Sequence, residues 1–175
     1  MANTVCNSLH VLGPREALER IAKTLEKGES PIQFGQIVPE PSPYPKSANP
    51  DIPDWYAWRG ANWGPAYEAT ETRLQDCGDE LFYTFETANS PAYPFMKRLA
   101  ELAKKNGCEL FGYWADVDEP AEFGGYGADG ERVKAPKDKA FLDSAGYIPD
   151  EDYEQEEIEE DERDVPYIPR LGYSN

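Results

Sequence analysis

The chain has 175 residues and a mass of 19.7 kDa, a length typical of one domain. It carries 34 acidic and 17 basic residues, and this net charge of −17 argues against direct binding of nucleic acid, whose phosphates proteins neutralise with Lys and Arg. No run of eighteen apolar residues occurs and the first residues lack the features of a secretory signal, so we expect a cytoplasmic protein without a membrane span.

The first forty residues predict a strand, a helix and a second strand. Residues 4–12 alternate between apolar and polar side chains, which is typical of a half-buried strand. Residues 15–27 place Leu18, Ile21 and Leu25 at helical spacing, with Pro14 before them and a glycine after them. Residues 31–38 contain alternating apolar side chains and predict the second strand.

Residues 39–69 look like an insertion rich in proline and tryptophan. Six prolines between positions 39 and 53 exclude regular structure and favour an extended loop that covers the surface. The run that follows is the main candidate binding site, through Trp55, Tyr56, Trp58, Arg59, Asn62 and Trp63. Two interpretations stay open: Arg59 stacks on the rings and stabilises a short amphipathic helix, which we prefer, or the rings wall a pocket in which Arg59 and Asn62 face a ligand.

The second half predicts two hairpins around a helix. Residues 70–75 and 80–87 flank a turn, with Leu81, Tyr83 and Phe85 on the core face. A second helix follows, for which Ser90 is the expected N-cap and Asn106-Gly107 the end. A strand at residues 108–115 and a hairpin formed by 123–126 and 131–134 complete the pattern.

This order predicts an α+β fold in which two helices cover one face of a mainly antiparallel sheet, as a two-layer sandwich. We expect one domain at residues 1–135 and an acidic extension at 136–175. Within the extension, residues 150–164 contain eleven acidic residues and one arginine, so this run carries −10 and the rest of the chain −7. The expected acidic interaction surface is Asp150, Glu151, Asp152, Glu154, Glu156, Glu157, Glu159, Glu160, Asp161, Glu162 and Asp164.

No catalytic pattern is visible. Ser90 lacks the glycine-flanked turn of a serine nucleophile, and the single histidine, His10, falls inside the first predicted strand. The three cysteines, Cys6, Cys77 and Cys108, stand far apart and form no metal-binding spacing. We therefore expect no enzymatic activity, no metal and no cofactor.

Three segments carry a family resemblance: N-T-V-C-N-S-L-H-V-L-G-P near the start, W-Y-x-W-R-x-x-N-W-G from Trp55, and F-x-T-A-x-S-P-x-x-P from Phe85. Together they resemble the YubB-like (Api-like) family of small phage, prophage and plasmid proteins of uncharacterised function. The resemblance covers about residues 3–135 and implies a ferredoxin-like domain and an origin in a mobile element, but no catalytic residues. The chain departs from the family pattern at residues 65–68, at Asn89 and in its acidic extension.

These observations predict a non-enzymatic protein of a phage or plasmid that binds and inhibits a host protein in the host cytoplasm. The expected partner has a basic surface, and an anti-defence factor that mimics DNA, directed against a restriction or CRISPR complex, is one form of this hypothesis. Two alternatives remain: a small-ligand-binding protein or enzyme built on the Trp55–Trp63 cluster, and an accessory or assembly protein of a phage.

Overall fold

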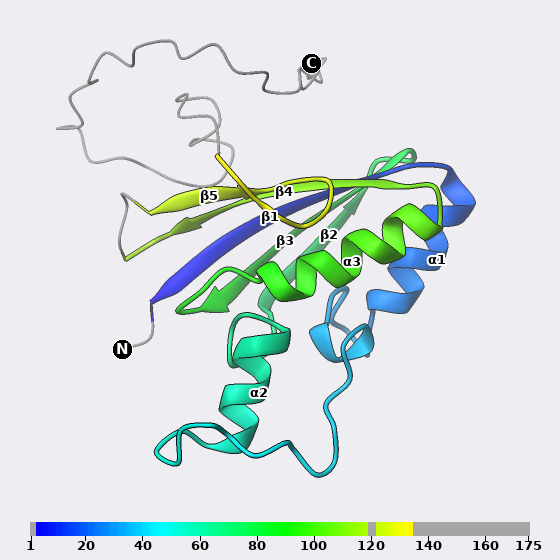
Figure 1. Ribbon diagram of the computed structural model, residues 1–175. Helices are drawn as coiled ribbons and strands as arrows, with labels where there is room; N and C mark the ends of the chain where they lie inside the picture. Colours follow the sequence, from blue (N-terminus) through cyan, green and yellow to red (C-terminus); the bar gives the residue numbers. More distant parts are fainter. Residues whose placement is uncertain (1–2, 119–121, 135–175) are drawn as a thin grey trace, which may run out of the picture.

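The computed structural model describes residues 3–118 and 122–134 and has an α+β architecture (Figure 1). In chain order its elements are β1 (Thr4–Leu12), α1 (Arg15–Leu25), the 3-10 helix η1 (Phe34–Gln36), α2 (Asp54–Asn62), β2 (Thr70–Asp76), β3 (Glu80–Ala88), α3 (Tyr93–Lys105), β4 (Glu109–Asp116), β5 (Phe123–Tyr126) and β6 (Arg132–Val133). The six strands form one antiparallel sheet, so the predicted α+β class and mainly antiparallel sheet are confirmed. The acidic extension lies outside the described residues.

The strands lie in the order β2-β3-β1-β4-β5-β6, which puts β1 between two long partners. Along β1, Thr4 lies opposite Ala88 of β3 and Leu12 opposite Glu80, while β4 pairs with β1 on the other side. Both predicted hairpins form, as β2–β3 and β5–β6. The edge strand β2 contains a bulge between Thr70 and Arg73.

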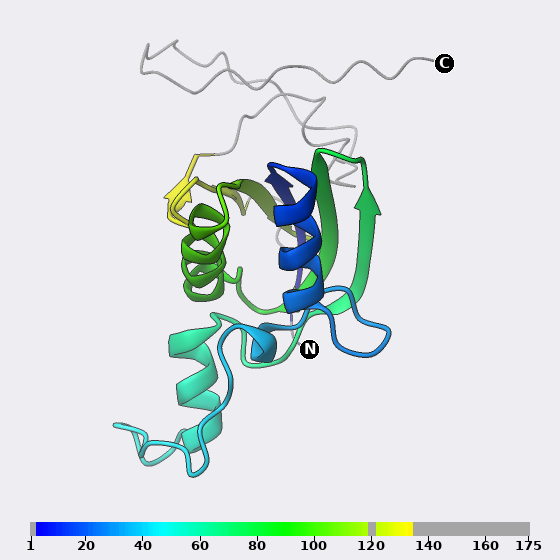
Figure 2. The same ribbon diagram turned by 90° about the vertical axis from the view of Figure 1, so that its right-hand side faces the viewer.

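One face of the sheet is packed and the other is not covered by any described helix. Figures 1 and 2 show α1 and α3 running along the same side of the sheet. On that side Leu9, Tyr83 and Phe85 are buried, together with Phe95 and Leu99 of α3. Each such side chain stabilises the fold by about 1.5–3 kcal/mol, because burial removes apolar surface from water. The alternation in β1 and β3 therefore follows the prediction from sequence.

The ends of the helices follow local sequence signals, with one exception. The carbonyl of Pro14 accepts the backbone N–H of Leu18 at 3.0 Å, which starts α1, and Gly107 ends α3 with a φ of 73°. The prediction of Ser90 as the N-cap of α3 is wrong, because the N-cap is Ala92. The hydroxyl of Thr87 donates to the carbonyl of Ser90 at 2.8 Å, so Ser90 belongs to the turn that leaves β3.

The strand predicted at residues 31–38 is also wrong, because this segment contains η1 and does not join the sheet. Ile32 and Phe34 are buried as an inward-facing strand residue would be. The backbone, however, is held by a distant carboxylate: Glu68 accepts the N–H of Phe34 at 2.6 Å and that of Gly35 at 2.9 Å. Two successive N–H groups directed at one side chain are incompatible with a strand ladder.

A buried polar network links the sheet to the start of α3. The hydroxyl of Tyr126 donates to Oδ1 of Asn7 at 2.6 Å and accepts the N–H of Ala92 at 3.0 Å. Asn7 Nδ2 donates to the carbonyl of Val5 at 2.9 Å and to Oγ1 of Thr87 at 3.1 Å. Asn7, Thr87 and Tyr126 are at most 3% exposed, so each of these bonds replaces water that the groups lost on folding.

Candidate functional site

The tryptophan-rich segment forms α2, which extends away from the sheet together with the proline-rich loop before it (Figures 1 and 2). Asp54 opens the helix, and its carboxylate accepts the N–H of Ser47 at 2.9 Å and the ammonium of Lys46 at 2.9 Å. The Ser47 N–H, with help from Lys46, lowers the pKa of the Asp54 carboxyl. A negative charge in the first turn suits the positive end of the helix dipole, which fixes where α2 begins.

Trp63, directly after α2, belongs to the core. Its side chain is 1% exposed, and its indole Nε1 donates to the carbonyl of Val38 at 2.9 Å. The ring centroid lies 6.0 Å from that of Phe34 and 5.9 Å from that of Trp58, both in edge-to-face geometry. Trp58 is only partly buried against this cluster. Trp63 thus anchors the end of α2 to the body.

Arg59 binds groups of its own chain. Its guanidinium carbon lies 5.2 Å from the ring of Trp55 and 5.0 Å from that of Trp63. Nε forms an ion pair with Glu40 of the proline-rich loop, and Nη1 donates to the carbonyl of Ala66 at 3.1 Å. The bond from Arg59 lowers the pKa of the Glu40 carboxyl. Arg59 therefore joins the loop, α2 and the segment after it.

Asn62, the other polar candidate, also bonds within the helix. Its Nδ2 donates to the carbonyl of Trp58, one turn earlier, at 2.8 Å. The amide thereby folds back onto its own helix, one turn toward the N-terminus. Neither this donor nor the two donors of Arg59 is directed at an open cavity.

The remaining aromatic residues of the segment are on the surface. Tyr56 is 40% exposed, Tyr67 is 51% exposed and Ile52 is 36% exposed. The ring of Trp55 lies between the two tyrosines, with centroids 5.5 Å from Tyr56 and 5.9 Å from Tyr67. We call Ile52, Trp55, Tyr56 and Tyr67 the α2 surface. Of the aromatic rings of α2, Trp58 packs partly against the core, whereas Trp55 and Tyr56 do not, so core packing does not explain these two rings.

The side of the sheet away from α1 and α3 carries a second set of aromatic residues. The strand register places His10 of β1 between Phe82 of β3 and Phe111 of β4, and Ser8 between Thr84 and Tyr113. We call this side the open face, defined by Cys6, Ser8, His10, Phe82, Thr84, Glu86, Phe111 and Tyr113. All eight side chains are partly exposed.

His10 is held in a stack. Its ring centroid lies 4.6 Å from that of Phe111 in a nearly parallel arrangement and 4.6 Å from that of Phe82. Its Nδ1 contacts the carboxylate of Glu80, which is 6% exposed. Cys6 stands four residues before His10 in the same extended strand, too far for the imidazole to deprotonate the thiol. Burial, with the negative charges of Glu86 and Asp116, raises the pKa of Cys6, which keeps this thiol protonated.

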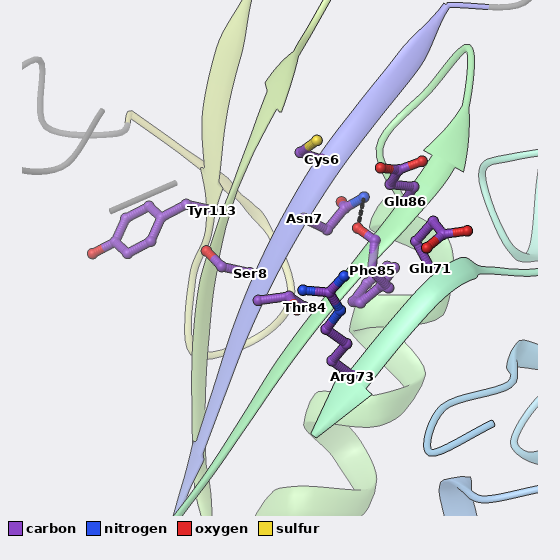
Figure 3. Close-up of a pocket in the computed structure, with 9 residues that line it drawn as sticks. All are labelled: Cys6, Asn7, Ser8, Glu71, Arg73, Thr84, Phe85, Glu86 and Tyr113. Carbon is purple, nitrogen blue, oxygen red and sulfur yellow. Dashed lines mark hydrogen bonds between the residues drawn. The ribbon is translucent and has the colours of Figure 1, made fainter. Parts of the chain in front are cut away.

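A hollow of about 210 Å³ lies on the open face beside β1 (Figure 3). Figure 3 shows Glu71, Arg73 and Glu86 on one side of β1 and Tyr113 on the other. Glu71 belongs to the bulge of β2 and has a φ of 47°. Within residues 3–118 and 122–134, neither carboxylate forms an ion pair, and neither does Arg73.

The sequence pattern singles out the α2 segment as a candidate site but does not single out the open face. The sequence predicts that His10 lies in a strand, but it does not show that Phe82 and Phe111 lie on either side of it. The available signal was that aromatic side chains occupy both alternating faces of β3 and β4, whereas a half-solvated strand is normally polar on one face. The acidic surface predicted at residues 150–164 lies outside the described residues.

Comparison with known proteins gives no relative from which a site could be transferred: no protein-family model, curated protein or solved structure matches the chain. Among the described residues, no helix has both the length and the apolar composition needed to cross a bilayer. In that same part of the chain, no group of three or more His, Cys, Asp and Glu side chains is placed to hold a metal ion.

Proposed function

We propose that this protein is a non-enzymatic interaction protein that binds and inhibits a host protein, and that the α2 surface makes the central contact. The observation that carries the proposal is a group of exposed side chains on and beside a helix that extends from the body: Tyr56 on α2, Ile52 and Tyr67 on either side of it, and the half-buried ring of Trp55 in contact with both tyrosines. Tyr and Trp dominate the energetically important positions of protein interfaces, because they bury large areas at a small cost in side-chain entropy.

The same geometry favours a protein partner over a small ligand at α2. A ligand pocket needs polar groups that converge on an enclosed space. The donors of Arg59 and Asn62 described above go to Glu40, Ala66 and Trp58 of the chain itself. What α2 offers outside is a convex aromatic surface, which is the shape of an anchor that enters a groove on another protein.

The charge of the chain indicates the partner's chemistry. With a net charge of −17, the protein attracts basic surfaces at long range, and this attraction speeds encounter and weakens with salt. A host protein with a basic surface fits, including a nucleic-acid-binding defence complex that an anti-restriction or anti-CRISPR factor would occupy as a DNA mimic. The resemblance to phage and plasmid proteins supports this anti-defence form and a location in the host cytoplasm.

We further propose that the domain is ferredoxin-like, with α1 and α3 as the helical layer. The support is the chain order β1-α1-β2-β3-α3-β4 with the strand order β2-β3-β1-β4, to which β5 and β6 are added at one edge. An experimental structure with β1 at an edge of the sheet would contradict this assignment.

The test compares partner capture by the wild-type full-length chain and by a Tyr56→Ser/Tyr67→Ser variant. Both tyrosines are exposed, so the fold should stay intact while the contact is lost. Leu74→Ser is a matched control, because Leu74 is 37% exposed on β2. We expect one saturable host protein to be retained by the wild type and by Leu74→Ser, to be lost by the tyrosine variant, and to associate more slowly at high salt. If no saturable partner is found, or if the tyrosine variant retains it equally, the proposal is wrong.

A further inference from the structure

We propose that the open face of the sheet is a second binding site, which takes a peptide segment of a partner protein that contains arginine or lysine beside an apolar residue. The site is independent of the α2 surface. Its parts are the stacked aromatic row of Phe82, His10 and Phe111 and the neighbouring hollow with Glu71 and Glu86.

The aromatic row supplies the apolar half of the site. His10 is fixed by stacking on two rings and by contact with Glu80, so the surface is ordered before any partner binds. A preformed aromatic surface costs little entropy when it is covered. Neither α1 nor α3 covers this side of the sheet, as Figure 2 shows.

The hollow supplies the charged half. Glu71 and Glu86 line it without an ion pair to any residue in the described ranges, and Thr84, Ser8 and Tyr113 continue its wall toward the aromatic row. A guanidinium or ammonium group in the hollow would neutralise the two carboxylates, and the apolar residue beside it would extend toward the aromatic row, which lies four strand residues from Glu86. Arg73, at the β2 side, is placed to donate to a backbone carbonyl of the same segment.

Charge distinguishes this occupant from single-stranded nucleic acid, the other ligand that aromatic sheet faces commonly bind. Nucleic-acid platforms combine stacking rings with a groove rich in Lys and Arg. In strands β1 to β5, Arg73 is the only such residue, whereas the register puts Glu80, Glu86 and Glu109 on this face. Phosphates would be repelled, and a cationic segment would be attracted.

The experiment is an NMR titration of the isotope-labelled full-length chain with the acetylated, amidated tripeptide Arg-Leu-Arg. The matched ligand is the same tripeptide with citrulline, a neutral isostere, in place of arginine. We expect saturable shifts at the backbone amides of Cys6, Ser8, Thr84 and Glu86, and about tenfold weaker binding of the citrulline peptide, because citrulline has no positive charge to strengthen its hydrogen bonds to the two carboxylates.

Two variants separate this site from general attraction to an acidic protein. Glu86→Gln should weaken the Arg-Leu-Arg peptide about tenfold. Glu29→Gln, which removes an exposed carboxylate outside the sheet, should leave the affinity unchanged. Equal losses in both variants, or shifts confined to residues outside the open face, would overturn the proposal. If an oligothymidine shifts the amide signals of the open face more strongly than the peptide does, the face binds nucleic acid and the proposal is wrong. If the chain forms a dimer that Glu86→Gln breaks, the face binds a second copy of this chain and the proposal is also wrong.

Discussion

Two buried tyrosines allow a direct test of the polar network between the sheet and α3. Removing the hydroxyl of Tyr126 by Tyr126→Phe deprives Ala92 N–H of its acceptor and Asn7 Oδ1 of its donor. A buried group left unpaired costs about 1–3 kcal/mol, so with two such groups the free energy of unfolding should fall by about 2–6 kcal/mol. The ring itself, packed 5.0 Å from Tyr93, is preserved in the variant.

Tyr83→Phe is the matched control, because Tyr83 is fully buried but its hydroxyl has no hydrogen-bond partner among the described residues. Burial, with the negative charges of Glu26 and Asp76, raises the pKa of Tyr83 far above its usual range, so the hydroxyl stays protonated. Removing this oxygen should leave stability unchanged or raise it by about 1 kcal/mol. Urea unfolding followed by circular dichroism measures both variants, provided that the denaturant slope stays the same. A loss below about 1 kcal/mol in Tyr126→Phe, or equal losses in the two, would refute this account of the network.

Three more predictions concern the α2 segment and a tight turn. Trp63→Ala should lower the free energy of unfolding, measured by urea unfolding, by about 3–5 kcal/mol because the ring is buried. Trp58→Ala should lower it by less, because the ring of Trp58 is only partly buried. Arg59 lowers the pKa of the Glu40 carboxyl below its ordinary 4.5, so the ion pair stabilises the loop fully above pH 4.5 and is lost as the pH falls through the lowered pKa. Tryptophan emission should show this acid transition in the wild type and not in Glu40→Gln. Gly130→Ala should cost about 2 kcal/mol or more in thermal unfolding, since φ is 71° and a Cβ would lie 2.4 Å from the backbone of α3.

Much of the sheet and both long helices could be predicted from the sequence, because their signals are local and repeated. β1 alternates over nine residues, and α3 repeats apolar residues at three- and four-residue spacing between a proline and Asn106-Gly107. In each such element many residues fit the same periodic pattern, so the type of element can be predicted from sequence. The short segment at 31–38 did not, because its conformation is decided by Glu68, more than thirty residues away.

The candidate site could be predicted only in part, because some of its contacts are local in sequence and others are distant. Composition alone identifies the aromatic run at 54–64, but it cannot tell which ring is inside: Trp63 is buried by contacts to Phe34 and Val38, whereas Tyr56 faces outward. The role of Arg59 in joining the loop to the helix depends on Glu40, a residue that belongs to a different pattern in the sequence. The open face is assembled from three strands and becomes visible only when their register is known.

The bulge in β2 has a consequence for how this protein behaves at high concentration. An exposed edge strand presents free N–H and C=O groups to which a strand of another molecule can add, and repeated addition leads to aggregates. In β2 the ladder is interrupted between Thr70 and Arg73, where Glu71 adopts the left-handed conformation, and nearly every side chain of the strand is exposed. At the opposite edge β6 contributes only two residues. Within the described part of the chain neither edge therefore offers a long, regular template, so crowded copies should remain separate through the geometry of their backbones as well as through their mutual repulsion.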